Sequence, residues 1–348
     1  MGLPTGYNKS MTNIAINGFG RIGRLFFRRV LDEPSLRMVA INDLGDIENL
    51  AYLLRYDTVY GRFGKKVRVE GDTLVVGGAT IGFLQERDPA KLPWKKLKVD
   101  IVVESTGMFE SYESARVHLA SGAKRVVITA PAKDADGTLG RTILMGVNDA
   151  ELKGVSMTSN ASCTTNAAAP VIQVLAENPG IRKAILNTAH AYTATQSIVD
   201  GPTRGKDYRR GRAAAQNIAP SSTGAAIALA RAIPELEGKF DGIAMRIPLV
   251  TGSIADITFV AKRATSVEEV NDILRKAAAS PRWKGLLSTT DEPLVSSDIV
   301  GEPYASIVDL GFTKVVDLDL VKVLAWYDNE AGYVATLVKH VLAAAKAL

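Results

Sequence analysis

Residues 13–23 read NIAINGFGRIG, an apolar, β-branched run that leads directly into Gly-x-Gly-x-x-Gly. After it, residues 24–32 place apolar side chains at the spacing of an amphipathic helix. A second apolar run, residues 38–41, ends at Asn42 and Asp43. The glycine pattern alone is weak, but here it lies between a strand and a helix and is followed by a second strand and an acid. The stretch therefore predicts a parallel βαβ unit.

This βαβ unit carries the fingerprint of a Rossmann dinucleotide-binding domain. Gly18, Gly20 and Gly23 would permit the tight turn and the close approach of the backbone to a pyrophosphate at the helix N-terminus. Asp43 would hydrogen-bond the adenosine ribose hydroxyls and repel a 2′-phosphate, and its neighbour Leu44 offers no cation. We therefore expect NAD rather than NADP. A turn or helix cap is the structural alternative for Asp43.

Two more strands are predicted in the first half. Residues 99–104 and 125–129 have the pattern of buried parallel strands, with a helical segment at 112–121 between them. Both runs end in small polar residues, and ligands of open α/β sheets lie at the carboxyl ends of strands. We expect these ends to face the cofactor, although turn chemistry alone also favours Ser, Thr and Gly there. Short runs at 67–69 and 74–76 predict a small antiparallel excursion.

The only cysteine, Cys163, lies in residues 159–166, which read SNASCTTN. A lone cysteine is most often an inert, small core residue. Here a polar turn opens a helix that we predict to run to about Glu177. Its N-terminal N–H groups and positive dipole end would favour the thiolate. Cys163 is therefore the candidate nucleophile.

The chain has only three histidines. His118 and His340 lie within helical patterns and are expected to be surface or packing residues. His190 closes a strand-like run at 184–189 and is the natural partner of Cys163. A Cys–His pair activates the thiolate and supplies a proton donor and acceptor for a carbonyl under attack. From the sequence alone, a purely structural histidine is an equal alternative for His190.

The second half also shows features that suit anions. Residues 201–217 form a long, basic segment with little periodicity, and so long a loop in a compact enzyme is usually functional. It continues into residues 220–226, a hydroxyl-rich turn that opens an alanine-rich helix and suits a phosphate. Arg246 lies in an apolar strand pattern, where its charge needs an anionic ligand or a buried carboxylate as a partner.

The remaining patterns complete the fold prediction. Strand patterns cover 254–261, 305–310 and 320–327, with a helix at 267–279 and an amphipathic helix at the C-terminus. The predicted class is α/β, a Rossmann dinucleotide-binding domain plus an α+β catalytic domain with a mostly antiparallel sheet.

We expect two domains. The first would comprise residues 1–162, with 1–10 as a leader outside the fold, and the C-terminal helix of 328–348 would complete it. The catalytic domain would comprise residues 163–327.

The charge, the cysteine count and the lengths of the apolar runs exclude several classes of protein. The chain of 348 residues has a net charge of +5 and one cysteine. No apolar run approaches the roughly 18 residues needed to span a membrane. A single cysteine excludes an intrachain disulfide framework and indicates a reducing compartment, so we expect the cytoplasm. The densest basic run, 204–212, favours a solvated face or an anion site over a nucleic-acid groove, since it has a single aromatic residue. We expect no nucleic acid, membrane or metal as a partner.

Four stretches together resemble the phosphorylating glyceraldehyde-3-phosphate dehydrogenases of glycolysis: 17–23, 159–166, 222–226 and 326–333. The resemblance covers essentially all of 11–348, and the Ser-Cys-Thr-Thr-Asn sequence is highly specific to this family and its close relatives. It implies an NAD-dependent conversion of D-glyceraldehyde 3-phosphate and inorganic phosphate to 1,3-bisphosphoglycerate, in a homotetramer.

The resemblance also implies roles for individual residues. Cys163 would add to the aldehyde to give a hemithioacetal, and His190 would accept the hydroxyl proton as the hydride leaves. Phosphate would then cleave the resulting thioester. Thr193 and Arg246 would hold the substrate phosphate. Arg210 matches a substrate-contacting arginine only loosely, because the length of that loop varies.

Two further sets of residues follow from the resemblance. The attacking phosphate would be bound by Ser162, Thr164, Thr223 and Gly224. The family's NAD contacts fall on Arg21, Ile22, Asp43, Arg87, Thr129 and Asn329, in addition to the glycine-rich turn.

The chain departs from the family pattern in two places. Ala167 stands where many members have a second cysteine, which removes a resolving thiol and excludes disulfide protection of Cys163 within the chain. Thr129 stands where serine is common and keeps the hydroxyl. Residues 1–10 match nothing in the family.

Rival interpretations remain at this point. Erythrose-4-phosphate dehydrogenases share the Ser-Cys-Thr-Thr-Asn stretch, but residues 222–224 at the phosphate turn resemble the triose-phosphate enzymes better. A Cys–His acyl transferase or peptidase would leave the NAD fingerprint without a purpose. A non-catalytic NAD-binding scaffold would have no need of Cys163, His190 and Arg246 together.

Overall fold

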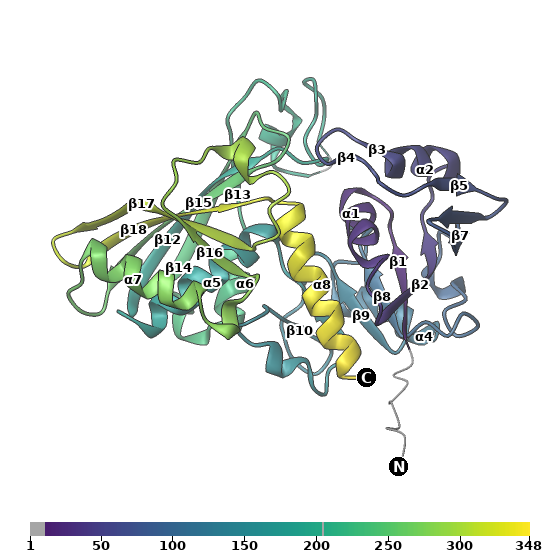
Figure 1. Ribbon diagram of the computed structural model, residues 1–348, viewed down its shortest axis with the longest axis horizontal. Helices are drawn as coiled ribbons and strands as arrows, with labels where there is room; N and C mark the ends of the chain where they lie inside the picture. Colours follow the sequence, from purple (N-terminus) through teal and green to yellow (C-terminus); the bar gives the residue numbers. More distant parts are fainter. Residues whose placement is uncertain (1–10, 204) are drawn as a thin grey trace, which may run out of the picture.

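The computed structural model describes residues 11–203 and 205–348, which form two halves (Figure 1). One half is built on a nine-stranded sheet and the other on a seven-stranded sheet, with a separate ribbon of β3 (Tyr56–Asp57) and β4 (Gly61–Arg62). The predicted leader, residues 1–10, lies outside the described residues. The predicted combination of a Rossmann domain with a second, mostly antiparallel sheet is confirmed.

The nine-stranded sheet is parallel over most of its width. Its strands follow the order β10 (Arg141–Thr142), β11 (Met157–Ser159), β9 (Arg125–Ile128), β8 (Ile101–Glu104), β1 (Thr12–Asn17), β2 (Leu36–Asn42), β7 (Ala79–Leu84), β6 (Thr73–Val76) and β5 (Val67–Val69). All pairs from β10 to β7 are parallel, whereas β7, β6 and β5 pair antiparallel, as predicted for this excursion. The parallel strands bring their carboxyl ends to one edge, where a ligand is expected.

Helices cover both faces of this sheet. On one face, α1 (Arg21–Val30), α2 (Ile47–Arg55) and the C-terminal helix α8 (Ala331–Lys346) share one apolar core with β1 and β8. On the other face lie Trp94 and two short helices, α3 (Tyr112–Ala115) and α4 (Val117–Ala120). The sequence predicted one helix at 112–121, but the structure has a turn at Arg116 between the two. Packing of α8 against α1 ties the end of the chain to its beginning (Figure 1).

The second sheet is mostly antiparallel. Its order is β13 (Ala219–Ser222), β14 (Phe240–Ile247), β12 (Ile181–Ala191), β15 (Ser253–Ala261), β18 (Leu320–Tyr327), β17 (Ser306–Val316) and β16 (Leu287–Thr290). Only the pairs β12–β14 and β16–β17 are parallel. Buried and partly exposed residues alternate strictly along β15, as expected for a sheet with one covered face.

Three helices cover one face of this second sheet. They are α5 (Cys163–Glu177), α6 (Ala225–Ala232) and α7 (Val267–Ala278), and their apolar side chains form one core with the inward residues of the strands. The predicted end of α5 at Glu177 is confirmed. Helix α5 begins next to the carboxyl edge of the first sheet, because it follows β11 after only three residues.

Candidate active site

The turn before α5 holds Cys163 at the first position of the helix. Ala161 has φ of +53°, a left-handed conformation that is uncommon for a residue with a side chain. The Nδ2 of Asn166 holds this turn by donating to the backbone oxygens of Asn160 at 2.7 Å and Ser162 at 2.9 Å. The Ser162 hydroxyl in turn caps the helix by accepting from the Thr165 N–H at 3.1 Å. Such backbone strain persists only where the surroundings enforce it, and it is frequent at active sites.

The second sheet brings His190 to this helix. On β12, the alternate residues Leu186, Thr188 and His190 are buried on the side that α5 covers. The Nε2 of His190 lies 3.2 Å from the Sγ of Cys163. The two residues that the sequence paired thus lie within hydrogen-bond reach, as a nucleophile and its base require.

The register of the sheet adds Arg246 to this pair. In the parallel pairing of β12 with β14, His190 lies opposite Arg246. Arg246 Nη1 is 2.7 Å from His190 Nδ1 and 3.3 Å from the carbonyl oxygen of Ala191. Within the described residues, Arg246 makes no ion pair with a carboxylate, and its buried Nε has no hydrogen-bond partner. Of the two partners considered from the sequence, an anionic ligand is therefore the one that suits this charge.

Burial and the arginines set the protonation of the pair. Desolvation, followed by the charge of Arg246, lowers the pKa of His190 to about 3, so the imidazole is neutral near pH 7. Desolvation raises the pKa of the Cys163 thiol, against opposing effects of Arg246 and Thr164. The expectation that the helix N-terminus leaves this thiol with a lowered pKa is not met, because the loss of hydration outweighs these favourable contacts.

Two adjoining hollows form a groove that ends at this pair. The first, of about 480 Å³, is lined among others by Cys163, His190 and Arg246. The second, of about 420 Å³, contains Asp43 and Arg87 in its walls. The two share three wall residues, Ser105, Thr106 and Phe109. A groove of this volume, with a few convergent polar groups, fits an elongated cofactor with its reactive end at Cys163.

The glycine-rich turn is shaped for a close backbone approach. A Cβ on Gly23 would lie 2.2 Å from the carbonyl oxygen of Gly18, and Gly18 itself has φ of +96°. No residue with a side chain fits this packing without a shift. Gly20 begins the helix as its N-cap and places no side chain at the entrance to the groove. The turn therefore matches a pyrophosphate cradle at a helix N-terminus.

Asp43 caps a turn and also lines the groove. Its Oδ2 accepts from the Phe19 N–H at 2.6 Å, and its Oδ1 accepts from the Gly45 N–H at 2.8 Å. These contacts make it a turn cap. Each carboxylate oxygen has a second lone pair, so Asp43 can still accept from hydroxyls in the groove that it lines.

Other predicted cofactor contacts lie in the walls of the groove near Cys163. Ile22, Thr129 and Asn329 line it together with Arg21. Asn329 Oδ1 accepts from the hydroxyl of Ser253 at 3.0 Å, which leaves Nδ2 as a donor for a ligand. The guanidinium of Arg21 is paired with Glu330 and Asp57, and these contacts raise its pKa. Its charge is thus largely neutralised within the chain.

The predicted phosphate ligands divide into two groups. Ser162, Thr193 and Arg210 lie in the wall with Cys163. The hydroxyl of Thr164 instead lies 3.0 Å from that of Tyr327, and the hydroxyl of Thr223 accepts from the Ala225 N–H at 3.2 Å. Thr223 and Gly224 belong to the turn before α6 and do not line this hollow. Their role as phosphate ligands stays a prediction.

Sequence reasoning missed residues that support the site. Thr195 lines the hollow, and its hydroxyl lies 3.2 Å from Arg210 Nη1 and 2.9 Å from the hydroxyl of Thr193. These two contacts fix the positions of both neighbours. The spacing of Thr195 two residues after Thr193 could have indicated from the sequence that both hydroxyls lie at the site. Tyr327 contacts Thr188 at 2.8 Å and stacks edge-on to His190, with 6.0 Å between the ring centroids. No local signal distinguished this tyrosine from an ordinary core residue.

The other two histidines are packing residues. His118 is fully buried, with Nε2 2.9 Å from a Glu104 carboxylate oxygen and Nδ1 accepting from the Trp94 indole N–H at 3.1 Å. His340 is also fully buried, between Thr158 and Asn160. The sequence left a surface position or a packing role open for His118 and His340, and their complete burial excludes the surface position.

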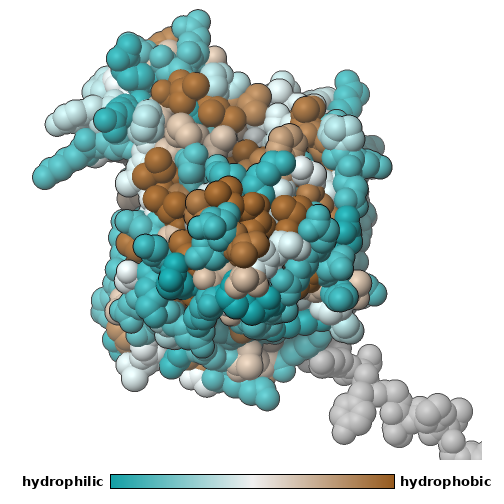
Figure 2. All heavy atoms as spheres, turned by 90° about the vertical axis from the view of Figure 1, so that its left-hand side faces the viewer, coloured by the Kyte–Doolittle hydropathy of each residue, from teal (hydrophilic) through white to brown (hydrophobic). Residues whose placement is uncertain are grey.

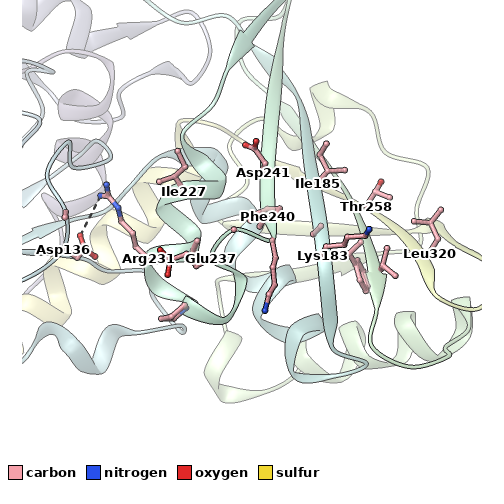
Figure 3. A pocket seen from close by; sticks show the side chains of 18 residues that line it. Asp136, Lys183, Ile185, Ile227, Arg231, Glu237, Phe240, Asp241, Thr258 and Leu320 are labelled. Atoms are coloured by element: carbon pink, nitrogen blue, oxygen red, sulfur yellow. Dashed lines mark ion pairs between the residues drawn. The ribbon is translucent and has the colours of Figure 1, made fainter.

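A larger hollow elsewhere lacks such chemistry. A hollow of about 1020 Å³ lies over the outer part of the second sheet, between β12, β14 and α6. Figure 3 shows that its labelled charged groups point in different directions, and the ion pair drawn, between Arg231 and Asp136, spans 4.0 Å. In 11–203 and 205–348, no group of three His, Cys, Asp or Glu side chains could hold a metal ion. No helix in these ranges is long and apolar enough to cross a membrane.

Comparison with known proteins identifies the family. A model described as "Glyceraldehyde 3-phosphate dehydrogenase, NAD binding domain" matches residues 12–112, and one described as "Glyceraldehyde 3-phosphate dehydrogenase, C-terminal domain" matches residues 162–329. The glyceraldehyde-3-phosphate dehydrogenase of Clostridium pasteurianum is 47% identical, over 94% of this chain and 97% of its own length. That of Streptomyces coelicolor is 49% identical over 93% and 96%. That of Mycobacterium avium is 49% identical over 96% and 99%. The chain therefore belongs to the glyceraldehyde-3-phosphate dehydrogenase family and is an NAD-dependent oxidoreductase.

Proposed function

We propose that the protein oxidises D-glyceraldehyde 3-phosphate with NAD and inorganic phosphate to 1,3-bisphosphoglycerate. The observation that carries this proposal is the contact of 3.2 Å between Cys163 Sγ and His190 Nε2, at the end of a dinucleotide-sized groove and beside two arginines. A nucleophile and base at the end of such a groove suit aldehyde oxidation, and the arginines suit phosphorylated ligands.

The nucleophile begins the reaction. Cys163 attacks the aldehyde carbon and forms a hemithioacetal, whose oxygen lies near the N-terminal N–H groups of α5 and the His190 side chain. His190 then accepts the hydroxyl proton at Nε2 while the carbon loses its hydride. The product is a thioester on Cys163. Inorganic phosphate attacks this thioester, and the released thiolate is ready for another turnover.

The groove is suited to hold NAD in the required orientation. Its Asp43 end would take the adenosine ribose, the turn around Gly18 the pyrophosphate, and Asn329 the nicotinamide end. The nicotinamide, when bound, accepts the hydride. Thr129 and Ile22 line the groove near Cys163 and would keep water from the reacting carbon.

The cations at the site would orient both phosphates. Arg246 and Thr193 are proposed to hold the substrate phosphate. Arg210 is positioned for an anion in the same hollow, because its guanidinium is fixed by Asp207 at 3.1 Å and by Ser221 at 3.1 Å. Ser162 would contribute its hydroxyl to the attacking phosphate. Two anions held close together need such fixed donors.

Absorbance of NADH tests the proposed reaction. The protein is mixed with NAD and glyceraldehyde 3-phosphate, with and without inorganic phosphate, beside Cys163→Ala. We expect sustained turnover that requires phosphate and is lost in the variant. Turnover that ignores phosphate would overturn the proposed second step. A higher kcat/KM with erythrose 4-phosphate would identify the rival substrate instead.

We also propose that the protein works as a homotetramer. The side of the second sheet opposite α5 is open and carries apolar residues, of which Ile185 is 56% and Ile243 52% exposed. Figure 2 shows hydrophobic side chains gathered on the face that lies at the left of Figure 1. Ile198, which precedes the long loop of residues 201–217, is 82% exposed. Exposed apolar side chains that gather on one face are typical of protein interfaces. Ile243→Glu should dissociate the assembly in analytical ultracentrifugation, and a monomeric wild type would refute the proposal.

A further inference from the structure

One nitrogen of His190 lies between two incompatible partners. Its Nδ1 is 2.6 Å from the carbonyl oxygen of Ala191 and 2.7 Å from the Nη1 of Arg246. A carbonyl oxygen only accepts a hydrogen bond, and a guanidinium only donates. Nδ1 satisfies Ala191 when it carries a proton and Arg246 when it does not. The two contacts therefore belong to different protonation states of one ring.

Each partner has a consequence for Cys163. When Arg246 donates to Nδ1, the neutral ring carries its single proton on Nε2, the atom that faces Sγ at 3.2 Å. In that state Nε2 cannot take the thiol proton. When Nδ1–H donates to Ala191 instead, Nε2 is bare and can accept that proton. The choice between Arg246 and Ala191 thus decides whether His190 can act as the base.

We propose that Arg246 holds His190 in the tautomer that cannot deprotonate Cys163, and that a phosphate group releases it by drawing the guanidinium away. The inference deepens the proposed function, on which it rests, since it assigns to the same anion site control over the nucleophile. On release, the ring proton moves from Nε2 to Nδ1 by exchange with solvent water, and Nδ1–H donates to Ala191. The Sγ–H bond then breaks, and its proton bonds to the bare Nε2. The result is a thiolate beside an imidazolium, with no other reactant consumed.

The charges around His190 agree with this mechanism. The groups that face the ring or act on its charge are Cys163 from α5, Arg246 from β14, Tyr327 from β18, and Arg210 from the long loop. Both arginines lower the pKa of His190, in addition to burial. An anion between them would cancel that repulsion and permit an imidazolium. The buried Nε of Arg246, which has no partner within the described residues, would gain an acceptor at the same time.

The direction in which a bound anion shifts the pKa of the Cys163 thiol distinguishes this mechanism from a simple charge effect. An anion placed near Cys163 disfavours a second negative charge and raises the pKa of the thiol. Release of His190 does the opposite, because the proton then has a base to move to. Anion binding should therefore lower the pH at which Cys163 becomes a thiolate.

Alkylation of Cys163 measures this pH directly. Cys163 is the only thiol in the chain, so mass spectrometry of the intact protein reports on it alone. The rate of reaction with iodoacetamide, a neutral reagent, is recorded against pH with and without saturating inorganic phosphate. Neither NAD nor aldehyde is added. We expect phosphate to move the midpoint down by about one pH unit, so that alkylation well below the midpoint becomes about tenfold faster. Steric blocking by phosphate would change the plateau rate and not the midpoint.

Two arginine variants complete the test. In Arg246→Met the midpoint should no longer respond to phosphate. Arg263→Met is the control, because Arg263 is exposed and follows the C-terminal end of β15. In this variant phosphate should shift the alkylation midpoint as far as in the wild type. A wild-type midpoint that stays in place or rises overturns the inference, whether or not Arg246→Met folds, and so does an undiminished response in Arg246→Met. Phosphate-dependent NADH formation is scored separately. Its absence would refute the proposed reaction without affecting the alkylation result.

Discussion

Asp328→Asn is expected to loosen the junction between the two halves of the molecule. Asp328 is fully buried, and its Oδ1 accepts from the backbone N–H groups of Glu330 and Ala331, each at 2.8 Å. Its Oδ2 accepts from the N–H of Gly301 at 2.8 Å, and the Tyr60 hydroxyl donates to the same carboxylate at 2.8 Å. One carboxylate therefore accepts from two N–H groups at the start of α8 and from donors in both halves of the molecule.

The structure sets the size of this effect. Asparagine keeps one oxygen but turns an NH₂ group toward an N–H, so that at least one charge-assisted hydrogen bond becomes a contact between two donors. Such a bond contributes about 1.5–3 kcal/mol, and a buried N–H left without an acceptor costs about 1–3 kcal/mol more. We expect the free energy of unfolding to fall by about 3–5 kcal/mol. NAD affinity should fall too, because Asn329 is the next residue and lines the groove.

Guanidinium unfolding and NAD titration at matched protein concentration measure both effects. Asp149→Asn is the control, because Asp149 is exposed, and its substitution should change stability by less than about 0.5 kcal/mol. A loss below about 1 kcal/mol for Asp328→Asn, with the same dependence on denaturant, would refute the view that this carboxylate joins the halves.

Three other substitutions test separate parts of the account. Gly23→Ala should weaken NAD binding and cost about 1–3 kcal/mol in denaturant unfolding, because its Cβ would lie 2.2 Å from the Gly18 oxygen; unchanged NAD titration would contradict this. Asp43→Ala should lower the ratio of kcat/KM for NAD over NADP about tenfold or more, and an unchanged ratio would restrict Asp43 to its turn-capping contacts. Burial lowers the pKa of His340 from 6.5 to about 3 in the folded protein. As the pH falls below 6.5, the unfolded chain therefore takes up a proton on His340 that the folded protein does not. The stability that is present above pH 6.5 is lost progressively as the pH falls toward 3. In His340→Gln, the free energy of unfolding, measured at several pH values, should fall less steeply with acid, by up to about 1.4 kcal/mol per pH unit. An unchanged slope would contradict a lowered pKa for His340.

Local patterns were sufficient to predict several elements. The βαβ unit of residues 13–43 follows from hydrophobic periodicity and glycine spacing, both of which are local. The polar turn before Cys163 likewise predicted α5, because the cap and the helix adjoin in sequence. The break at Arg116 and the strand β13 were missed. Pairing with β14 makes a strand of a hydroxyl-rich stretch whose local pattern predicts a turn.

Long-range register explains what the sequence did not reveal about the site. The sequence suggested Cys163, His190 and Arg246 separately, but the contact between the last two depends on the parallel register of β12 and β14. That register joins segments more than fifty residues apart, as the separation of 56 between His190 and Arg246 shows. The raised pKa of the Cys163 thiol is also a product of burial, which only the assembled fold determines.

The thioester on Cys163 is the central claim, and mass spectrometry of the intact protein tests it most directly. The protein is mixed with NAD and glyceraldehyde 3-phosphate in the absence of inorganic phosphate and quenched in acid. We predict one NADH per subunit and one phosphoglyceroyl group on Cys163, which is discharged when phosphate is added before the quench. NADH formation that continues without phosphate, or an adduct on any other residue, would contradict the account.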